Sequence, residues 1–302
     1  MADMSEIRAV GFIGLGVMGL PICRNIVTKS GLPVTAFDLD PAPVQRLAEF
    51  GVAAAASAAE VAQAADTILL SLPGAEQVTE VADALAEAMV PGQTLVDLGT
   101  TPVALTRDLA RRFAALGVDY ADAPVARTRA AAEAGTLSIQ VGAEPEVFQR
   151  IEPLLRHAAS EVSHCGAVGA GQIVKLMNNM VLFQTVNALA EALAIGRRAG
   201  VDGRVLLETM AKGSADSFAL RNHGLKHMLP GSFPPRSFPT DYALKDLGYA
   251  LKLADEMGVR ARGAETTRTV LIQSRAAGNQ DRYFPALIGV VDKADTGDDG
   301  DA

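Results

Sequence analysis

Short apolar runs alternate with helix-like segments over the first half of the chain. The runs have the length of buried strands, and the segments between them repeat apolar residues at helical spacing. Glycine and proline residues separate the units where turns are needed. We expect strands at 9–13, 33–37, 67–72, 94–98, 120–121 and 138–141, and helices at 18–29, 42–50, 58–64, 76–89 and 103–115. This alternation predicts an α/β domain with a parallel, doubly wound sheet.

The pattern changes at the glycine-rich stretch GAVGAGQ, residues 166–172. An apolar, proline-free run follows at 173–199 and predicts a helix ~40 Å long at 1.5 Å per residue, enough to join two domains. Beyond it the strand patterns stop, and helices are expected at 204–211, 219–228, 242–257 and 261–277. We therefore predict an α/β domain at 1–166, an all-α domain at 167–293 joined by the long helix, and a disordered acidic tail at 294–302.

Composition and charge narrow the classes of partner. The 302 residues carry a formal charge of −8, which argues against a basic groove for nucleic acid and favours a small-molecule partner. No run approaches the ~20 apolar residues of a membrane span. The N-terminal segment lacks the layout of a signal peptide, and two distant cysteines suit reduced thiols, so we expect a cytoplasmic protein. The four histidines show no metal-like spacing with acids or thiols, and no metal site is expected.

A glycine loop follows the first predicted strand. Gly14, Gly16 and Gly19 form a G-x-G-x-x-G pattern that opens a helix, with Val17 and Met18 between the last two glycines. In this context one glycine makes the tight turn, one lets the backbone approach a pyrophosphate, and one permits close helix–strand packing. The N–H groups of the helix start then face the phosphates. The loop predicts a Rossmann-type dinucleotide site that includes all five residues.

Asp38 ends the second predicted strand and specifies the dinucleotide. A carboxylate there accepts hydrogen bonds from the adenosine ribose. A 2′-phosphate would meet a like charge, and Leu39 offers no guanidinium to compensate. We therefore expect NAD as the cofactor, in preference to NADP. The plainer alternative is that Asp38 is only a turn residue before Pro41.

Four segments, FIGLGVMGLPICRNI, LSLPGAEQV, VDLGTTP and GAGQIVKLMNN, together resemble the β-hydroxyacid dehydrogenase family, typified by 3-hydroxyisobutyrate dehydrogenase. The resemblance runs from residue 10 to about 291. It implies that Leu72, Pro73 and Thr100 contact the cofactor, and that Lys245 closes over it from the helical domain. Gly99 departs from the pattern, because the family has serine there.

The resemblance also implies that Lys175 is the catalytic lysine and that Asn179 orients the substrate. Reduction of an aldehyde places negative charge on the carbonyl oxygen, and a donor aimed at that oxygen stabilises the charge and delivers a proton. The two residues are spaced i, i+4 and share one helix face. The plainer alternative is a lysine and an asparagine on an exposed face. Asn178 is expected to contact the substrate; decarboxylating 6-phosphogluconate relatives have histidine before the asparagine and a larger helical domain, so that activity is disfavoured.

The substrate loop is unusual. After DAPV most of the family has Ser-Gly-Gly, whereas this chain has Ala126, Arg127 and Thr128. A guanidinium presents several fixed donors to an oxyanion, which suits the three oxygens of a sulfonate. The Arg-Thr pair, together with Asp241, is similar to 3-sulfolactaldehyde reductases within the family. Arg127, Thr128 and Asp241 are therefore predicted to bind a small anionic semialdehyde, with 3-sulfolactaldehyde the sharpest guess.

Alternatives remain open at this point. The substrate class includes 3-hydroxyisobutyrate, 4-hydroxybutyrate and tartronate semialdehyde. A non-catalytic NAD-binding protein is the alternative from another class, although it gives no reason to keep Lys175; that lysine also disfavours an imine reductase. The resemblance implies a homodimer or homotetramer, which the remaining apolar face of the long helix would suit.

Overall fold

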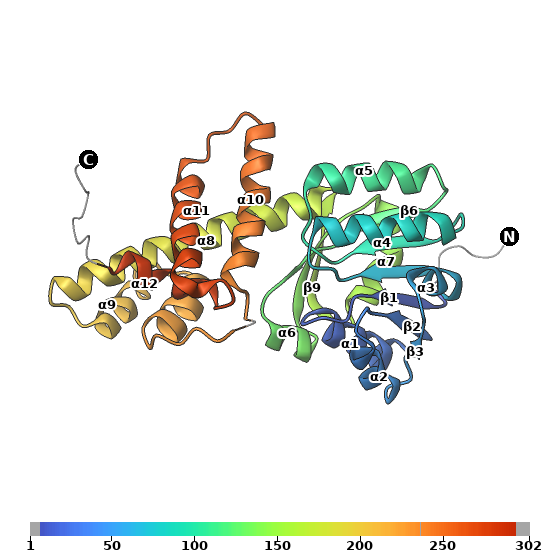
Figure 1. The fold of residues 1–302 in the computed structure, drawn as a ribbon, viewed down its shortest axis with the longest axis horizontal. Coiled ribbons are helices and arrows are strands. Elements are labelled where there is room, and N and C mark those ends of the chain that lie inside the picture. Colours follow the sequence, from blue (N-terminus) through green and yellow to red (C-terminus); the bar gives the residue numbers. More distant parts are fainter. Residues whose placement is uncertain (1–6, 236, 294–302) are drawn as a thin grey trace. The chain divides into compact units, whose positions relative to one another are not determined.

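The computed structural model describes residues 7–235 and 237–293, so the predicted tail at 294–302 lies outside the described residues. The chain forms two compact units, Met1–Lys175 and Leu176–Ala302. The first is a sheet with helices on both faces and the second is helical (Figure 1). This is the fold class expected from the sequence. The boundary predicted after Gly166 stays a prediction.

The sheet of the α/β unit is parallel through its centre. The strands are β1 (Val10–Ile13), β2 (Val34–Phe37), β3 (Ala53–Ala54), β4 (Thr67–Leu70), β5 (Thr94–Asp97), β6 (Asp119–Asp122), β7 (Val125–Ala126), β8 (Leu137–Gly142) and β9 (Ala159–Gly166). Their order is β3-β2-β1-β4-β5-β6-β8-β7, with β9 paired to β8. The six strands β3-β2-β1-β4-β5-β6 pair in parallel, each with the next in this order. Strand β8 is antiparallel to β6 and β7. The outermost part therefore departs from the purely parallel sheet that was expected.

Helices cover both faces of this sheet. They are α1 (Gly19–Ser30), α2 (Pro41–Ala48), α3 (Ala58–Ala64), α4 (Ala75–Ala88), α5 (Val103–Ala114), α6 (Arg129–Ala134) and α7 (Pro145–Leu155). One core cluster combines Phe12 with Ile22 of α1 and Ile151 of α7, and the other combines Ile68 with Val78 of α4 and Phe113 of α5. Side chains along β1 and β4 alternate between the two clusters, as a doubly wound sheet requires.

Helices alone make the second unit. Helix α8 (Ala170–Arg198) begins in the α/β unit and continues here; it is followed by α9 (Gly203–Met210), a π-helical segment (Leu220–Met228), α10 (Thr240–Glu256), α11 (Arg262–Ser274), a π-helical turn (Arg275–Asn279), a 3-10 turn (Phe284–Leu287) and α12 (Ile288–Val291). The expected helix 261–277 ends at Ser274, and Gly278 has a φ of 85° just beyond it.

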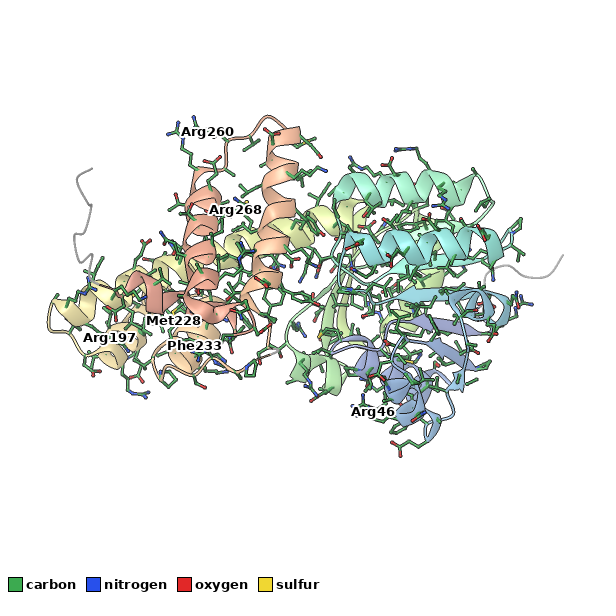
Figure 2. The ribbon with its side chains drawn as sticks, in the orientation of Figure 1. Arg46, Arg197, Met228, Phe233, Arg260 and Arg268 are labelled. Carbon is green, nitrogen blue, oxygen red and sulfur yellow. The ribbon has the colours of Figure 1, made fainter. Side chains whose placement is uncertain are left out.

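The core of the helical unit is a single cluster that includes Phe183, Leu220, Leu247, Leu271 and Phe284. Among the side chains labelled in Figure 2, Met228 is buried, whereas Arg197, Arg260 and Arg268 are exposed. Apolar residues therefore fill the core of this unit, and these three arginines lie outside it.

Candidate functional site

The glycine loop connects β1 to α1 in the α/β unit. Gly14 has a φ of 91°, and a Cβ there would lie 2.4 Å from the Ser71 carbonyl oxygen. A Cβ at Gly19 would lie 2.0 Å from the Gly14 carbonyl oxygen, whereas a Cβ at Gly16 would meet nothing within 4 Å. Two glycines thus serve local packing, and the third faces open space of the kind a pyrophosphate fills. No side chain caps the start of α1, so its N–H groups suit phosphate oxygens.

Asp38 follows β2 directly and is half-buried. Its Oδ2 accepts a hydrogen bond from the Leu15 N–H of the glycine loop at 2.5 Å, and its Oδ1 accepts one from Asp40 at 2.9 Å. The carboxylate therefore ties the glycine loop to the end of β2. Each oxygen carries a second lone pair, which suits the hydroxyls of a ribose. Leu39, beside it, is 93 % exposed.

The remaining predicted cofactor residues of this unit follow two neighbouring strands. Leu72 and Pro73 come after β4, and Thr100 comes after β5. Because β1, β4 and β5 are adjacent and parallel, these residues and the glycine loop lie at the same edge of the sheet. The residues at this edge fit a dinucleotide, since crevices at the carboxyl ends of parallel strands are where such cofactors bind. A Cβ at Gly99 would lie 3.0 Å from Asp97 Oδ1, so the family's serine would be tightly packed here.

A buried carboxylate that the sequence analysis missed anchors the start of α8. Asp122, at the end of β6, accepts hydrogen bonds from the N–H groups of Gly169 at 2.6 Å and Gln172 at 2.7 Å. Burial raises the pKa of Asp122 to about 6; the Gly169 and Gln172 bonds lower it and the charge of Asp97 raises it. The carboxylate thus supplies the acceptors that the first turn of a helix requires.

Gln172 makes a second connection from α8 to the sheet. It is fully buried; its Oε1 accepts from the Thr101 N–H at 3.2 Å and its Nε2 donates to the Gly99 carbonyl at 2.9 Å. Thr101 Oγ1 donates to Asp97 Oδ2 at 3.2 Å. The segment that carries Thr100 and the helix that carries Lys175 are therefore held together. Asp122 begins the DAPV segment, and Gln172 lies in GAGQIVKLMNN. Their places in these two motifs were the only sign in the sequence that they have a structural role.

Lys175 and Asn179 are both buried on α8, at 8 % and 3 % exposure, while Asn178 is exposed. Their i, i+4 spacing on one continuous helix places them on the same face, as the sequence predicted. Asn178 Nδ2 donates to Asn179 Oδ1 at 3.2 Å. Buried polar groups are costly unless they are hydrogen-bonded, and Asn179 is held by hydrogen bonds to Asn178 and Asp246.

In the helical unit, Asp246 of α10 is a second buried carboxylate that the sequence analysis missed. Its Oδ2 accepts a hydrogen bond from Asn179 Nδ2 at 2.8 Å, and its Oδ1 lies 3.3 Å from Lys245 Nζ. The Lys245 ammonium also lies 5.1 Å from the centre of the Tyr242 ring. The structure thus brings together two predicted residues, Asn179 and Lys245. Asp241, in the first turn of α10, is exposed and one turn before Lys245.

The predicted substrate loop lies between β7 and β8. Among the described residues, only Arg127, with a φ of 85°, and Phe238 have a positive φ without being glycine. Arg127 Nη1 donates to the Thr136 carbonyl at 2.5 Å and to Ser160 Oγ at 2.7 Å. Thr128 caps α6, its Oγ1 accepting from the Ala131 N–H at 3.4 Å. Both residues are exposed, and their contacts are with their own surroundings.

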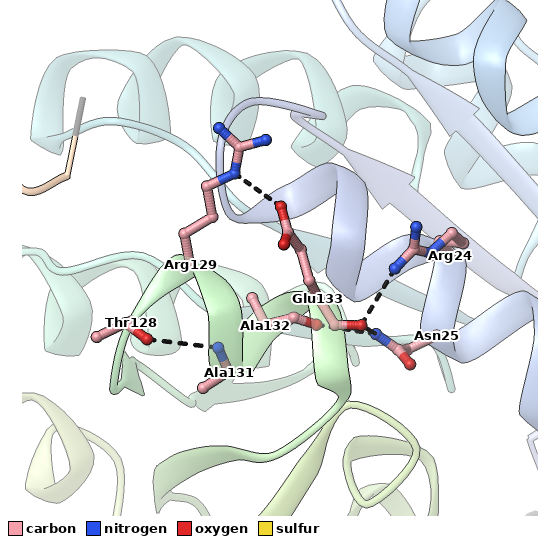
Figure 3. A network of polar contacts seen from close by, with 7 residues as sticks. All are labelled: Arg24, Asn25, Thr128, Arg129, Ala131, Ala132 and Glu133. Carbon is pink, nitrogen blue, oxygen red and sulfur yellow. Dashed lines mark hydrogen bonds and ion pairs between the residues drawn. The ribbon is translucent and has the colours of Figure 1, made fainter. Parts of the chain in front are cut away.

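Helix α6 is tied to α1 beside this loop, as Figure 3 shows. Arg24 Nη2 donates to the Glu133 carbonyl at 3.1 Å, and Asn25 Nδ2 donates to the Ala132 carbonyl at 2.9 Å. Arg129 pairs with Glu133 at 2.9 Å across one turn of the exposed helix. Arg127 and Arg129 therefore differ: Arg127 sits on a left-handed backbone, whereas Arg129 makes an ordinary surface ion pair.

A buried pair in the helical unit has no place in the predicted chemistry. Tyr283 Oη and His223 Nδ1 lie 2.6 Å apart, and His223 Nε2 is buried with no hydrogen-bond partner among the described residues. Burial lowers the pKa of His223 to about 4, with a contribution from the charge of His227. His223 is therefore neutral in the folded protein near pH 7.

Two kinds of feature are absent from the described chain, which has gaps at 1–6, 236 and 294–302. It holds no group of three histidine, cysteine or acidic residues that could bind a metal ion. No helix within it has both the length and the apolar character to cross a bilayer. An open groove of about 650 Å³ does lie in the helical unit, lined by Leu251 of α10, Arg268 of α11 and the loop between them, which includes Arg260. None of the predicted site residues lines it.

Comparison with family models covers nearly the whole described chain. Residues 9–166 match the model described as the NAD binding domain of 6-phosphogluconate dehydrogenase. Residues 169–291 match the one described as "NAD-binding of NADP-dependent 3-hydroxyisobutyrate dehydrogenase". The two matches correspond to the dinucleotide-type half and the helical half of the sequence.

Individual proteins are similar over most of their length. The 2-(hydroxymethyl)glutarate dehydrogenase of Eubacterium barkeri is 38 % identical over 290 residues, 95 % of this chain and 96 % of that protein. The 2-hydroxy-3-oxopropionate reductase of Escherichia coli is 31 % identical over 92 % of this chain and 95 % of its own. A structure of Mycobacterium tuberculosis 3-hydroxyisobutyrate dehydrogenase with L-serine has a TM-score of 0.88 at 29 % identity, covering 95 % of this chain and all of the other.

Proposed function

The chain belongs to the β-hydroxyacid dehydrogenase family typified by 3-hydroxyisobutyrate dehydrogenase, and we propose that it interconverts a small anionic β-hydroxyacid and its semialdehyde. It is an NAD-binding oxidoreductase that acts on a CH–OH group. One observation carries the residue assignment: Lys175 and Asn179 are both buried on one face of α8. A buried amine one turn from a buried amide suits proton transfer at a carbonyl oxygen.

The chain's residues divide the work between binding and proton transfer. Gly14, Gly16, Val17, Met18, Gly19, Asp38, Leu72, Pro73, Thr100 and Lys245 are proposed to hold the cofactor. Bound NADH supplies the hydride that reduces the carbonyl carbon. Lys175 Nζ donates a proton to the carbonyl oxygen as that oxygen becomes negative, and takes the hydroxyl proton back in the oxidising direction. Asn179 holds the reacting oxygen or the lysine in place.

The cofactor preference rests on Asp38. Its carboxylate already accepts two backbone N–H groups, and that leaves lone pairs for ribose hydroxyls but a like charge for a 2′-phosphate. The exposed Leu39 offers an apolar surface and no cation. We therefore propose NAD in preference to NADP. A Michaelis constant lower for NADPH than for NADH would contradict it.

The substrate proposal rests on Arg127. This residue stands where most of the family has glycine, and its φ of 85° shows why glycine suits the place. A side chain held at such a backbone angle costs about 1–3 kcal/mol, and strain of this kind is concentrated at functional sites. We propose that Arg127, with Thr128, Asn178 and Asp241, recognises the anionic end of the substrate, and that this end is a sulfonate, as in 3-sulfolactaldehyde.

A turnover survey tests both levels of the proposal. NADH oxidation is measured with 3-sulfolactaldehyde and with succinic, methylmalonic and tartronic semialdehydes. Activity with any of them supports the dehydrogenase, and a higher kcat/KM for the sulfonate supports the substrate. Replacing Arg127 by glycine is expected to relieve the backbone strain and raise the Tm while removing the sulfonate preference. An unchanged preference in that variant would contradict the role of Arg127.

A carboxylate substrate is the second candidate, because the similar proteins from Eubacterium barkeri and Escherichia coli are named for carboxylate substrates. The survey separates the candidates, since 3-hydroxyisobutyrate, 4-hydroxybutyrate and tartronate-semialdehyde enzymes prefer a carboxylate. Absence of NADH oxidation with every semialdehyde would instead favour the non-catalytic NAD-binding alternative.

Self-association completes the proposal. On α8 the exposed apolar residues Val174, Val181 and Ile195, at 43 %, 58 % and 69 % exposure, repeat at multiples of seven positions. Such a stripe supports burial against another copy of the chain in a homodimer or homotetramer. Light scattering at micromolar concentration measures the mass directly.

A cytoplasmic location is also proposed, and the free thiols of Cys23 and Cys165 support it.

A further inference from the structure

Asp246 is a buried carboxylate that contacts two residues with separate proposed tasks. It is 2 % exposed, its Oδ2 accepts from Asn179 Nδ2 at 2.8 Å, and its Oδ1 lies 3.3 Å from Lys245 Nζ. A buried carboxylate is unfavourable unless it is paired and hydrogen-bonded. Here one oxygen faces the residue assigned to the substrate, and the other faces the residue assigned to the cofactor.

The contact to Asn179 fixes which side of its amide is presented. A carboxylate only accepts hydrogen bonds, so the NH₂ group of Asn179 must point toward Asp246. The Oδ1 atom then points elsewhere, and Asn178 Nδ2 donates to it at 3.2 Å. Asn179 therefore offers its carbonyl oxygen, which accepts a bond from a hydroxyl or an ammonium group. The opposite orientation would offer donors, which a protonated lysine cannot use.

The contact to Lys245 fixes the ammonium group on α10. Neighbouring helical residues do not normally face each other, so the side chain of Lys245 must fold over to reach Asp246. The rings of Tyr242 and Tyr249 lie near the Lys245 side chain, with their centres 5.1 and 5.6 Å from Nζ. The carboxylate thus holds the positive charge in a defined place on the helix.

We propose that Asp246 is a positioning residue that couples the cofactor-binding lysine to the substrate-orienting asparagine. The inference rests on the proposed function. Through one shared carboxylate, placement of the Lys245 ammonium and orientation of the Asn179 amide depend on each other. Coupling of this kind is reciprocal, so a change at either residue alters binding at the other.

The variant Asp246→Asn keeps the shape of the side chain and removes its charge. The matched control is Asp255→Asn, the same change at an exposed position of α10. For Asp246→Asn we expect an NADH dissociation constant at least about fivefold higher, by NADH fluorescence, and a kcat about 10- to 100-fold lower. Asp255→Asn is expected to leave both within about twofold of wild type.

Double variants distinguish coupling from a general structural effect. Adding Lys245→Met to Asp246→Asn should weaken NADH binding by less than the product of the two single effects, and adding Asn179→Ala should lower kcat by less than the corresponding product. A purely structural loss would instead make the effects multiply and would lower the Tm in each double variant. Effects that multiply, or an Asp246→Asn variant with unchanged NADH binding and kcat, would overturn the proposal.

If Asp246→Asn does not fold, the single variants carry the test. Asn179→Ala should raise the NADH dissociation constant at least about threefold, although its own proposed ligand is the substrate. Lys245→Met should likewise raise the substrate KM at saturating NADH. No cross-effect in either variant would overturn the coupling. The NADH arm does not depend on turnover: a wild type without turnover refutes the proposed function, while these binding results still decide the coupling.

Discussion

The α/β unit and the helical unit position their proposed site residues by different means. In the α/β unit the backbone places the predicted cofactor residues, through glycines and strand ends at one edge of a parallel sheet. In the helical unit a side chain does it, because Asp246 of α10 holds Asn179 of α8. Backbone requirements such as those of the glycines leave a local pattern in the sequence, whereas side-chain partnerships leave almost none.

Substitutions in the glycine loop are expected to have the largest effects on folding free energy and NADH affinity. Gly19→Ala places a Cβ 2.0 Å from a carbonyl oxygen, and we expect a loss of about 3 kcal/mol of folding free energy. Gly16→Ala meets nothing within 4 Å, so its unfolding should match wild type within about 0.5 kcal/mol. Its NADH affinity should nevertheless fall about tenfold, or about 1.4 kcal/mol. Urea unfolding and NADH titration measure both; equal unfolding effects in the two variants would contradict the account.

The two units should also respond to pH in opposite directions. Burial raises the pKa of Asp122 from 3.8 to about 6, so between these values the folded state binds more protons than the unfolded state. The contribution of Asp122 to the stability of the α/β unit is then present below pH 3.8 and is lost as pH rises through about 6, by about 3 kcal/mol in total. Hydrogen exchange of peptides around β6 measures this, and Asp122→Asn should flatten the slope.

His223 gives the opposite sign in the helical unit. Burial lowers its pKa from 6.5 to about 4, so between these values the unfolded state binds more protons. The contribution of His223 to the folding free energy is present above pH 6.5 and is lost as pH falls through about 4, again by about 3 kcal/mol. Hydrogen exchange in the Leu220–Met228 segment reports it, with His223→Gln as the control. The same pH slope in both units would refute the contrast.

A smaller effect is expected at the cofactor's ribose. Replacing Asp38 by asparagine removes the like charge that opposes a 2′-phosphate and keeps an acceptor for the Leu15 N–H. The ratio of kcat/KM for NADH to that for NADPH should fall about tenfold, which is about 1.4 kcal/mol. An unchanged ratio would show that Asp38 is only a turn residue.

The smallest effect is expected at Arg129. Its exposed ion pair with Glu133 is worth about 0.5 kcal/mol or less, so Arg129→Ala should leave stability and turnover near wild type. The neighbouring Arg127→Ala should lower kcat/KM for the best anionic substrate at least about tenfold. Equal effects of the two substitutions would remove the distinction between the arginines.

The same contrast explains how much the sequence could predict. Gly14, Gly16 and Gly19 could be singled out because their pattern lies within one strand–turn–helix unit, and Asp38 because it directly follows a predicted strand. The short strands β3 and β7 and the helix α6 were missed, since two to six residues carry too little periodicity. Helix α7 was also missed; it begins with a proline and contains Pro153.

Asp122 and Asp246 were missed for a different reason. Their partners Gln172 and Asn179 lie 50 and 67 positions away in the sequence, and only the folded chain brings them together. Asp122 begins the DAPV segment of the predicted substrate loop, and Asp246 directly follows Lys245 in the sequence. The sequence could have pointed to them only as charged residues that stand beside predicted site residues and have no predicted role of their own.

Replacement of Lys175 tests whether its amine transfers the proton. Lys175→Ala is compared with Lys252→Ala, an exposed lysine of α10, in single-turnover NADH oxidation with the best semialdehyde of the survey. The account predicts that Lys175→Ala lowers the rate about 10²- to 10⁴-fold, with the NADH dissociation constant within about twofold of wild type. A near-normal rate in Lys175→Ala would contradict it.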